Sequence, residues 1–120
     1  MDNSKIVLGT VQLGLNYGIS NTTGITTGEE AGKIFKIAKK NDINLLDTAI
    51  NYGNSENVIG TTCGFNIITK IPMVPKNLSL NEMEFWINEQ IDNSLDRLKI
   101  DKLYAALLHF PEQLFDTNGR

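Results

Sequence analysis

The sequence predicts an α/β fold organised around a parallel sheet. Strand-like and helix-like segments alternate over the 120 residues in the order β-α-β-α-β-α-β, which favours parallel strands joined by helices. The three later strand-like segments are continuous apolar runs, as is typical of parallel strands that are buried on both faces. The length allows one domain at most, spanning residues 1–120, with a modest core.

The first part of the chain predicts a strand, a loop and a helix. Residues 5–12 are interpreted as the first strand, and residues 13–27 as a loop that contains several glycines. Thr27 and Glu30 have the spacing of a capping box, which predicts a helix over about 28–40. An apolar stripe at helical spacing supports this helix and consists of Ala31, Ile34, Phe35 and Ala38.

The remaining elements are predicted from the same kinds of signal. They are a strand at 44–48, a short helix at 55–62, a strand at 65–70, a helix at about 80–98 and a strand at about 103–108. Pro72 and Pro75 mark the loop before the long helix. Ser79 and Glu82 form a second capping-box pattern, which predicts where that helix begins.

Apolar side chains on one side of the long helix are expected to pack in the core. This stripe contains Met83, Ile87, Ile91, Leu95 and Leu98, and it is widened by Phe85 and Trp86. Tyr104, within the fourth strand, is also expected to be buried. Another loop is predicted to begin at Phe110-Pro111.

Charge, hydropathy and cysteine content argue against several functional classes. Eleven basic and 14 acidic side chains give a net charge of −3 without a basic block, so no nucleic-acid partner is expected. The apolar runs are too short to span a bilayer, and residues 1–5 show no signal peptide, so a cytoplasmic protein without a membrane partner is expected. Cys63 is the single cysteine and is expected to be a small buried residue that closes a helix.

Four polar side chains are predicted at, or just beyond, the ends of three strands. Asp47 ends the apolar run of the second strand, Lys70 ends the third, and His109 follows the fourth. Tyr52 lies in the loop after Asp47, next to Gly53, which allows a tight turn. Ligands of parallel α/β folds bind at the carboxyl ends of the strands, so we expect these four side chains to form one site.

These four groups together suit the reduction of a carbonyl by hydride. A free phenol is a poor acid at neutral pH, but a nearby ammonium stabilises the phenolate. Lys70 could supply this charge and Asp47 its counter-ion, which would leave Tyr52 ready to protonate a developing alkoxide. His109 could hydrogen-bond the same oxygen. The hydride has to come from a cofactor, because no side chain supplies one.

Each of these residues also has a purely structural interpretation. An aspartate at a strand end often caps a turn, a lysine there is often solvated, and a single histidine can be a hydrogen-bonded core residue. Tyr17, in the first loop, is an alternative phenol on the same face of the fold. The four residues together are harder to explain in this way than any one of them alone.

The sequence resembles the aldo-keto reductase family in three motifs. Residues 47–56, Asp-Thr-Ala-Ile-Asn-Tyr-Gly-Asn-Ser-Glu, resemble the family signature Asp-Thr-Ala-x-x-Tyr-Gly-x-Ser-Glu. Ile68-Thr69-Lys70 resembles the family's lysine motif, and Leu107-Leu108-His109-Phe110-Pro111 resembles its histidine motif. The match runs from about Leu8 to Pro111, which is nearly the whole chain.

The resemblance implies an NAD(P)H-dependent reductase of small carbonyl compounds on a (β/α)8 barrel of the TIM type, with no metal ion. Tyr52 would then be the general acid, tuned by Lys70 and Asp47, and His109 would orient the carbonyl. The resemblance also places Gly9, Thr10 and Val11 beside the nicotinamide of NADPH or NADH, and Asp47 against its ribose. The opening, residues 8–18, looks most like a bacterial branch often linked to the synthesis of cell-surface polysaccharides.

The length departs from that family. A barrel of this kind takes about 250 residues, so the resemblance implies only the N-terminal half, with about four strands and three helices. Three hypotheses stay open: part of a longer reductase, a non-catalytic half barrel that associates with itself or with a second half through exposed edges, and a nucleotide-binding regulatory subunit. The substrate and the choice between NADPH and NADH cannot be predicted from these residues.

Overall fold

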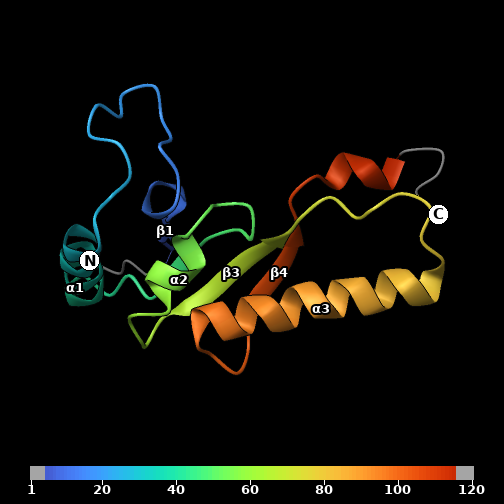
Figure 1. The fold of residues 1–120 in the computed structure, drawn as a ribbon. Helices are drawn as coiled ribbons and strands as arrows, with labels where there is room; N and C mark the ends of the chain where they lie inside the picture. Colours follow the sequence, from blue (N-terminus) through green and yellow to red (C-terminus); the bar gives the residue numbers. More distant parts are fainter. Residues whose placement is uncertain (1–4, 116–120) are drawn as a thin grey trace.

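The sheet is parallel throughout the part of the chain that the structure describes, residues 5–115 of this computed structural model. Its strands are β1 (Val7–Gly9), β2 (Leu45–Asp47), β3 (Asn66–Ile71) and β4 (Ala105–Leu108). They lie side by side in chain order, so β1 and β4 are the edge strands (Figure 1). The predicted α/β fold with a parallel sheet is confirmed.

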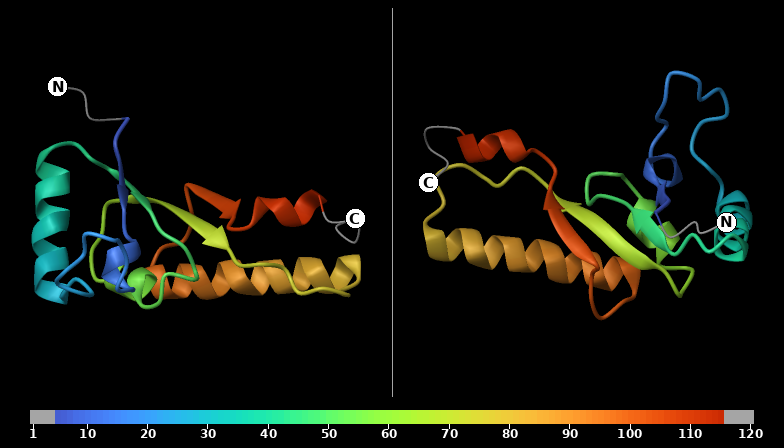
Figure 2. Two further views of the ribbon diagram at one scale, coloured as in Figure 1. Left: turned by 90° about the horizontal axis from the view of Figure 1, so that it is seen from above. Right: turned by 180° about the vertical axis from the view of Figure 1, so that it is seen from behind.

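The helices within this range are α1 (Gly28–Lys40), α2 (Ser55–Ile59) and α3 (Leu80–Leu98). Both long helices begin at their predicted caps. The Thr27 hydroxyl accepts a hydrogen bond from the Glu30 backbone N–H at 3.2 Å, and Ser79 and Glu82 form a complete capping box. Figure 2 shows α1 at the β1 side of the sheet and α3 running along β3 and β4.

β1 is shorter than the predicted strand at 5–12. After Gly9 the chain turns into a 3-10 helix, η1 (Val11–Leu13). The turn is fixed by Thr10, whose backbone N–H and hydroxyl both donate to the carbonyl oxygen of Asp47, at 3.0 and 2.9 Å. This long-range contact ends the strand, and local sequence pattern does not reveal it.

Other elements also differ from the prediction: β2 and β3 each differ by one residue at both ends, and three differences are larger or of another kind. α2 ends at Ile59 rather than residue 62. The chain passes close to α3 directly after it, where a Cβ atom on Gly60 would overlap the Arg97 carbonyl oxygen. β4 begins at Ala105 rather than residue 103. A 3-10 helix, η2 (Pro111–Phe115), stands where a loop was predicted.

The core lies between the helices and one face of the sheet. Its buried residues are Leu13, Ala31, Phe35, Leu46, Ile59, Ile67 and Leu98. Burying a side chain such as Leu46, which is 0% exposed, contributes roughly 1.5–3 kcal/mol. Side chains of β3 alternate, with Ile67 and Thr69 buried and Ile68 and Lys70 only partly buried. The prediction of strands buried on both faces is therefore wrong for β3.

Several expected core residues are exposed. Phe85 is 73% exposed, and of the apolar stripe of α3 only Leu98 is fully buried. Figure 1 shows the reason, since the amino-terminal part of α3 extends past the strands. Tyr104 is 65% exposed, and Cys63 is exposed in the loop after α2, so both burial predictions are wrong. The predictions about residues 1–4 and 116–120 lie outside the described residues.

Candidate active site

The four predicted site residues come from the same edge of the sheet. Asp47 is the last residue of β2, and Lys70 is the last but one of β3. His109 directly follows β4, and its backbone N–H donates to the Ile71 carbonyl at 3.0 Å. Tyr52 lies in the loop between β2 and α2. The parallel register thus brings the carboxyl ends of three neighbouring strands to one place.

Lys70 is bound by Asp47 through both carboxylate oxygens. Its ammonium nitrogen lies 2.8 Å from Oδ1 and 2.8 Å from Oδ2, and it also donates to the carbonyl oxygen of Thr48 at 2.9 Å. The Lys70 side chain is 17% exposed and that of Asp47 is 34% exposed. An ammonium withdrawn from water requires such compensation, so the pair keeps a positive charge stable at this edge.

The ring of Tyr52 contacts both this charge and the imidazole. The Lys70 ammonium is 5.0 Å from the centroid of the Tyr52 ring, within the range of a cation–π contact. The His109 and Tyr52 ring centroids are 5.7 Å apart at 87°, an edge-to-face arrangement. His109 also stacks on Phe110, with centroids 4.9 Å apart. The aromatic contacts hold the phenol and the imidazole together.

The alternative interpretations of these residues can now be compared with their positions. Tyr17 is 60% exposed in the loop after η1, and the phenol in contact with both Lys70 and His109 is Tyr52. Lys70 is ion-paired rather than solvated. His109 Nδ1 is buried and lacks a hydrogen-bond partner among the described residues, unlike a fully hydrogen-bonded core histidine.

The loop that carries Tyr52 is tightly folded. The Tyr52 backbone N–H donates to the Ala49 carbonyl at 3.0 Å, and the Tyr52 carbonyl accepts from the Ser55 N–H at 3.0 Å. Gly53 has a φ of +54°, in the left-handed region where a side chain is strained. These turns fix the phenol through its own backbone.

The residues predicted at the cofactor lie at the end of β1, beside Asp47. Gly9 pairs with Asp47 in the parallel register, and a Cβ atom on Gly9 would meet nothing within 4 Å. The backbone is therefore open there, which fits a flat ring. Thr10 is 2% exposed and its hydroxyl is engaged with the Asp47 carbonyl, while Val11 opens η1 and is partly buried.

Sequence reasoning gave no role to a set of buried polar residues behind the site. Glu56 is 2% exposed, and its carboxylate binds Thr69, Ser94 and Arg97. Thr10, Thr48 and Ser55 form a second buried group. One signal was available in the sequence: Thr69 is a hydroxyl residue that directly follows the apolar pair Ile67-Ile68, and Glu56 closes the signature-like segment.

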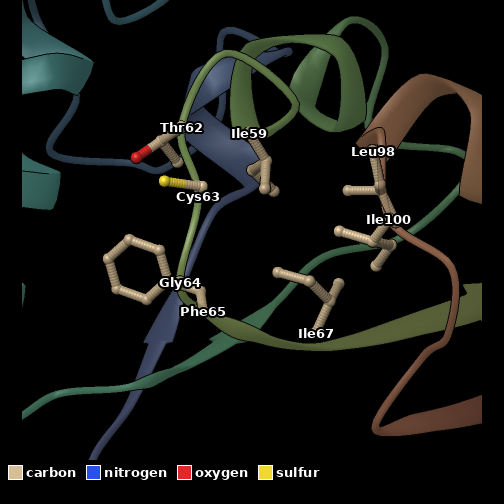
Figure 3. A pocket seen from close by; sticks show the side chains of 8 residues that line it. All are labelled: Ile59, Thr62, Cys63, Gly64, Phe65, Ile67, Leu98 and Ile100. Carbon is tan, nitrogen blue, oxygen red and sulfur yellow. The ribbon is translucent and has the colours of Figure 1, made fainter.

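Two hollows in the surface lie near the sheet, one away from the four predicted site residues and one beside the end of β1. Figure 3 shows a pocket lined by eight residues between Ile59 and Ile100, at the amino end of β3 and thus at the opposite end from Lys70. Its volume of about 10 Å³ holds at most about one water molecule. A larger hollow of about 110 Å³ is lined by Gly9, Thr10 and residues of α1.

Residues 5–115 contain neither a cluster of metal-binding side chains nor a membrane-spanning helix. No group of three or more histidine, cysteine, aspartate or glutamate side chains there is arranged to hold a metal ion. Within the same range, no helix is long and apolar enough to cross a membrane.

Comparison with known proteins agrees with the three motifs. The model of the Aldo/keto reductase family matches residues 5–117. Two solved structures from Pseudomonas aeruginosa, both described as putative aldo-keto reductases, are similar. One has a TM-score of 0.70 and 25% identity, covering 93% of this chain and 46% of that one. The other has a TM-score of 0.69 and 24% identity, covering 93% and 44%.

The chain therefore spans less than half the length of these solved structures. The second likeness, at 24% identity, shows the fold alone. No match was found among curated proteins. The predicted half of a (β/α)8 barrel is confirmed by the parallel four-stranded sheet and the partial coverage of these barrels. Since the family model covers most of its length, the chain belongs to the aldo/keto reductase family, of whose barrel it forms about one half.

Proposed function

We propose that residues 1–120 carry the catalytic residues of an NAD(P)H-dependent reductase of aldehydes or ketones. The chain would be a partial oxidoreductase domain of a longer cytoplasmic enzyme. The observation that carries the proposal is the contact sequence Asp47–Lys70–Tyr52–His109 at one sheet edge. Membership of the family supports oxidoreductase chemistry on carbonyl compounds.

Each of the four residues has a physical task in this proposal. Tyr52 donates a proton to the oxygen of the carbonyl as negative charge develops on it. The Lys70 ammonium, held by both oxygens of Asp47, stabilises the phenolate that remains. His109, whose imidazole is nearly perpendicular to the Tyr52 ring, orients the carbonyl oxygen toward the phenol. The imidazole and the phenol thus bind one oxygen from two directions.

The nicotinamide cofactor, when bound, supplies the hydride. Gly9, Thr10 and Val11 at the end of β1, together with Asp47, are the residues of this chain proposed to hold its reactive ring and ribose. The open backbone at Gly9 supports this assignment. NADPH and NADH are both compatible with it.

Turnover tests the proposal directly. The 120-residue chain, and any longer form that contains it, is mixed with NADPH and a generic aldehyde, and the loss of NADPH absorbance is followed. We expect Tyr52→Phe to abolish reduction while NADPH fluorescence still reports binding, because phenylalanine keeps the ring contacts with Lys70 and His109. Tyr17→Phe is the matched control and should keep the wild-type rate. Near wild-type reduction by Tyr52→Phe would remove Tyr52 from its role.

A second candidate is a half barrel that binds nucleotide without turnover. It is favoured by the length, since the chain spans 46% of a similar solved structure. Binding of NADPH without turnover, unchanged by Tyr52→Phe, would support this candidate over the first.

A further inference from the structure

Glu56 is a buried carboxylate to which the proposed reaction gives no task. Its side chain is 2% exposed, yet its oxygens are well compensated. Oε1 accepts hydrogen bonds from the Thr69 hydroxyl and the Ser94 hydroxyl, both at 2.6 Å, and Oε2 accepts from Arg97 Nε at 2.8 Å. A buried charge is costly unless it is paired in this way, so the arrangement calls for a physical reason.

The partners of Glu56 connect it with the site. Thr69 immediately precedes Lys70 on β3, and successive side chains of a strand point to opposite faces. Thr69 is 0% exposed on the helix side, whereas Lys70 reaches Asp47 on the other side. Glu56 lies four residues after Tyr52, in the first turn of α2. One carboxylate thus ties the segment that carries Tyr52 to the strand that carries Lys70.

Ser55 ties the same segment to β1 and β2. Its hydroxyl lies 2.9 Å from the Thr10 carbonyl oxygen, to which it donates, and 3.1 Å from the Thr48 hydroxyl. The Thr10 hydroxyl in turn donates to the Asp47 carbonyl. Two adjacent residues at the start of α2 therefore fix the Tyr52 loop against the ends of three strands, and Glu56 supplies the link to β3.

We propose that Glu56 is a positioning residue, which holds Tyr52 in register with Lys70 by binding the Thr69 hydroxyl from the helix side of β3. If Glu56 only stabilised the fold, its bonds to Ser94 and Arg97 on α3 would matter as much as its bond to Thr69 on β3. The consequence for rate rests on the proposed function. The position of the Tyr52 ring does not depend on the proposed function, and it can be measured without cofactor or turnover.

Two variants separate these roles, because Thr69 and Ser94 donate to the same oxygen at the same distance. Thr69→Val removes the bond to β3, and Ser94→Ala removes the bond to α3. His109 is the only histidine, so the NMR signal of its imidazole Hε1 proton can be assigned without ambiguity, and that signal senses the Tyr52 ring, whose plane lies at 87° to the imidazole. Tyr52→Leu, in the same 120-residue chain, defines the position of the signal without the ring.

Thr69→Val is expected to move the imidazole signal toward the Tyr52→Leu position, and Ser94→Ala to leave it in place. Where the wild type turns over, Thr69→Val should also lower kcat about tenfold with little change in KM, as small displacements of reacting groups do. Glu56→Gln keeps an oxygen for both hydroxyls and should stay nearer the wild-type signal than Glu56→Ala.

The opposite results would overturn the proposal. If Thr69→Val and Ser94→Ala lower the unfolding midpoint alike and both leave the imidazole signal in place, Glu56 only stabilises the fold. The same holds if both variants displace the signal equally. Absence of turnover in the wild type would instead count against the proposed function, and the NMR comparison would still decide the role of Glu56.

Discussion

The backbones of Gly14 and Gly53 approach each other closely in the loops that follow β1 and β2. A Cβ atom on Gly14 would overlap the carbonyl oxygen of Tyr52, and one on Gly53 would overlap the carbonyl oxygen of Gly14. Gly53 also has a positive φ of +54°. The backbone beside the phenol therefore has no room for a side chain at either position.

We expect Gly53→Ala to destabilise the chain by more than about 1 kcal/mol, because it adds a steric overlap to an unfavourable φ. The measurement is unfolding by urea. Gly24→Ala is the matched control, since Gly24 has a φ of +81° and nothing within 4 Å of an added Cβ. Equal losses for the two variants would show that φ alone matters and that the close approach to Gly14 does not.

The second prediction concerns the contribution of the Asp47–Lys70 ion pair to stability. Asp47→Asn should lower stability by about 1–3 kcal/mol, because the Lys70 ammonium, on a side chain that is only 17% exposed, loses its ionised partner. Adding Lys70→Met should recover much of that stability, since no charge then stays unpaired. Neither protein should reduce an aldehyde. A double variant no more stable than Asp47→Asn alone, as measured in urea, would contradict the ion-pair explanation.

A third prediction concerns how the stability contributed by Glu82, in the capping box of α3, depends on pH. Hydrogen bonds from the Ser79 hydroxyl and then the Ser79 N–H hold the pKa of Glu82 below its ordinary value of 4.5. A lowered folded-state pKa gives stability that is present above 4.5 and is lost as the pH falls through the folded-state pKa. Wild type should therefore unfold at a higher temperature than Glu82→Gln well above pH 4.5, and the difference should disappear in stronger acid.

Thermal unfolding followed by circular dichroism measures this difference. Glu84→Gln, at an exposed position two residues further along α3, controls for the loss of a negative charge. A gap between wild type and Glu82→Gln that persists unchanged in strong acid would contradict the role of the ionised capping box.

The anchoring of α3 gives a fourth prediction. Leu98 is 1% exposed and Leu80, at the other end of the helix, is 74% exposed. Leu98→Ala should cost about 2–5 kcal/mol, the range for a large-to-small change in a core. Leu80→Ala should change stability by less than about 0.5 kcal/mol. Similar losses in urea unfolding would mean that the helix is held along its whole length.

Local sequence signals predicted where the long helices begin, whereas tertiary contacts determine where β1 ends and whether Tyr104 is buried. Thr27 and Ser79 fix the starts of α1 and α3 through bonds within four residues, so the sequence reveals them. The end of β1 depends on the bond between Thr10 and Asp47, 37 positions apart, and it was mispredicted. Burial of Tyr104 was mispredicted for the same kind of reason, since it depends on what packs beside β4.

The positions of the candidate site residues were more predictable than the buried hydrogen bonds of Glu56 behind them. Chain direction alone places Asp47, Lys70 and His109 at one edge once the strands are parallel. The role of Glu56 could not be predicted in the same way, because a glutamate at the start of a helix is normally solvated. Only the packing of α2 between β3 and α3 encloses it.

The uniform direction of the four strands restricts how the open side of β4 can be extended. A tight turn reverses the chain, so a hairpin would add an antiparallel neighbour and break the pattern. A fifth strand of the same polarity must arrive by a crossover, which carries a helix with it. Whatever extends this side in parallel therefore brings its own helix, which would cover the helix side of β4, where the exposed Ala106 pairs with the buried Thr69.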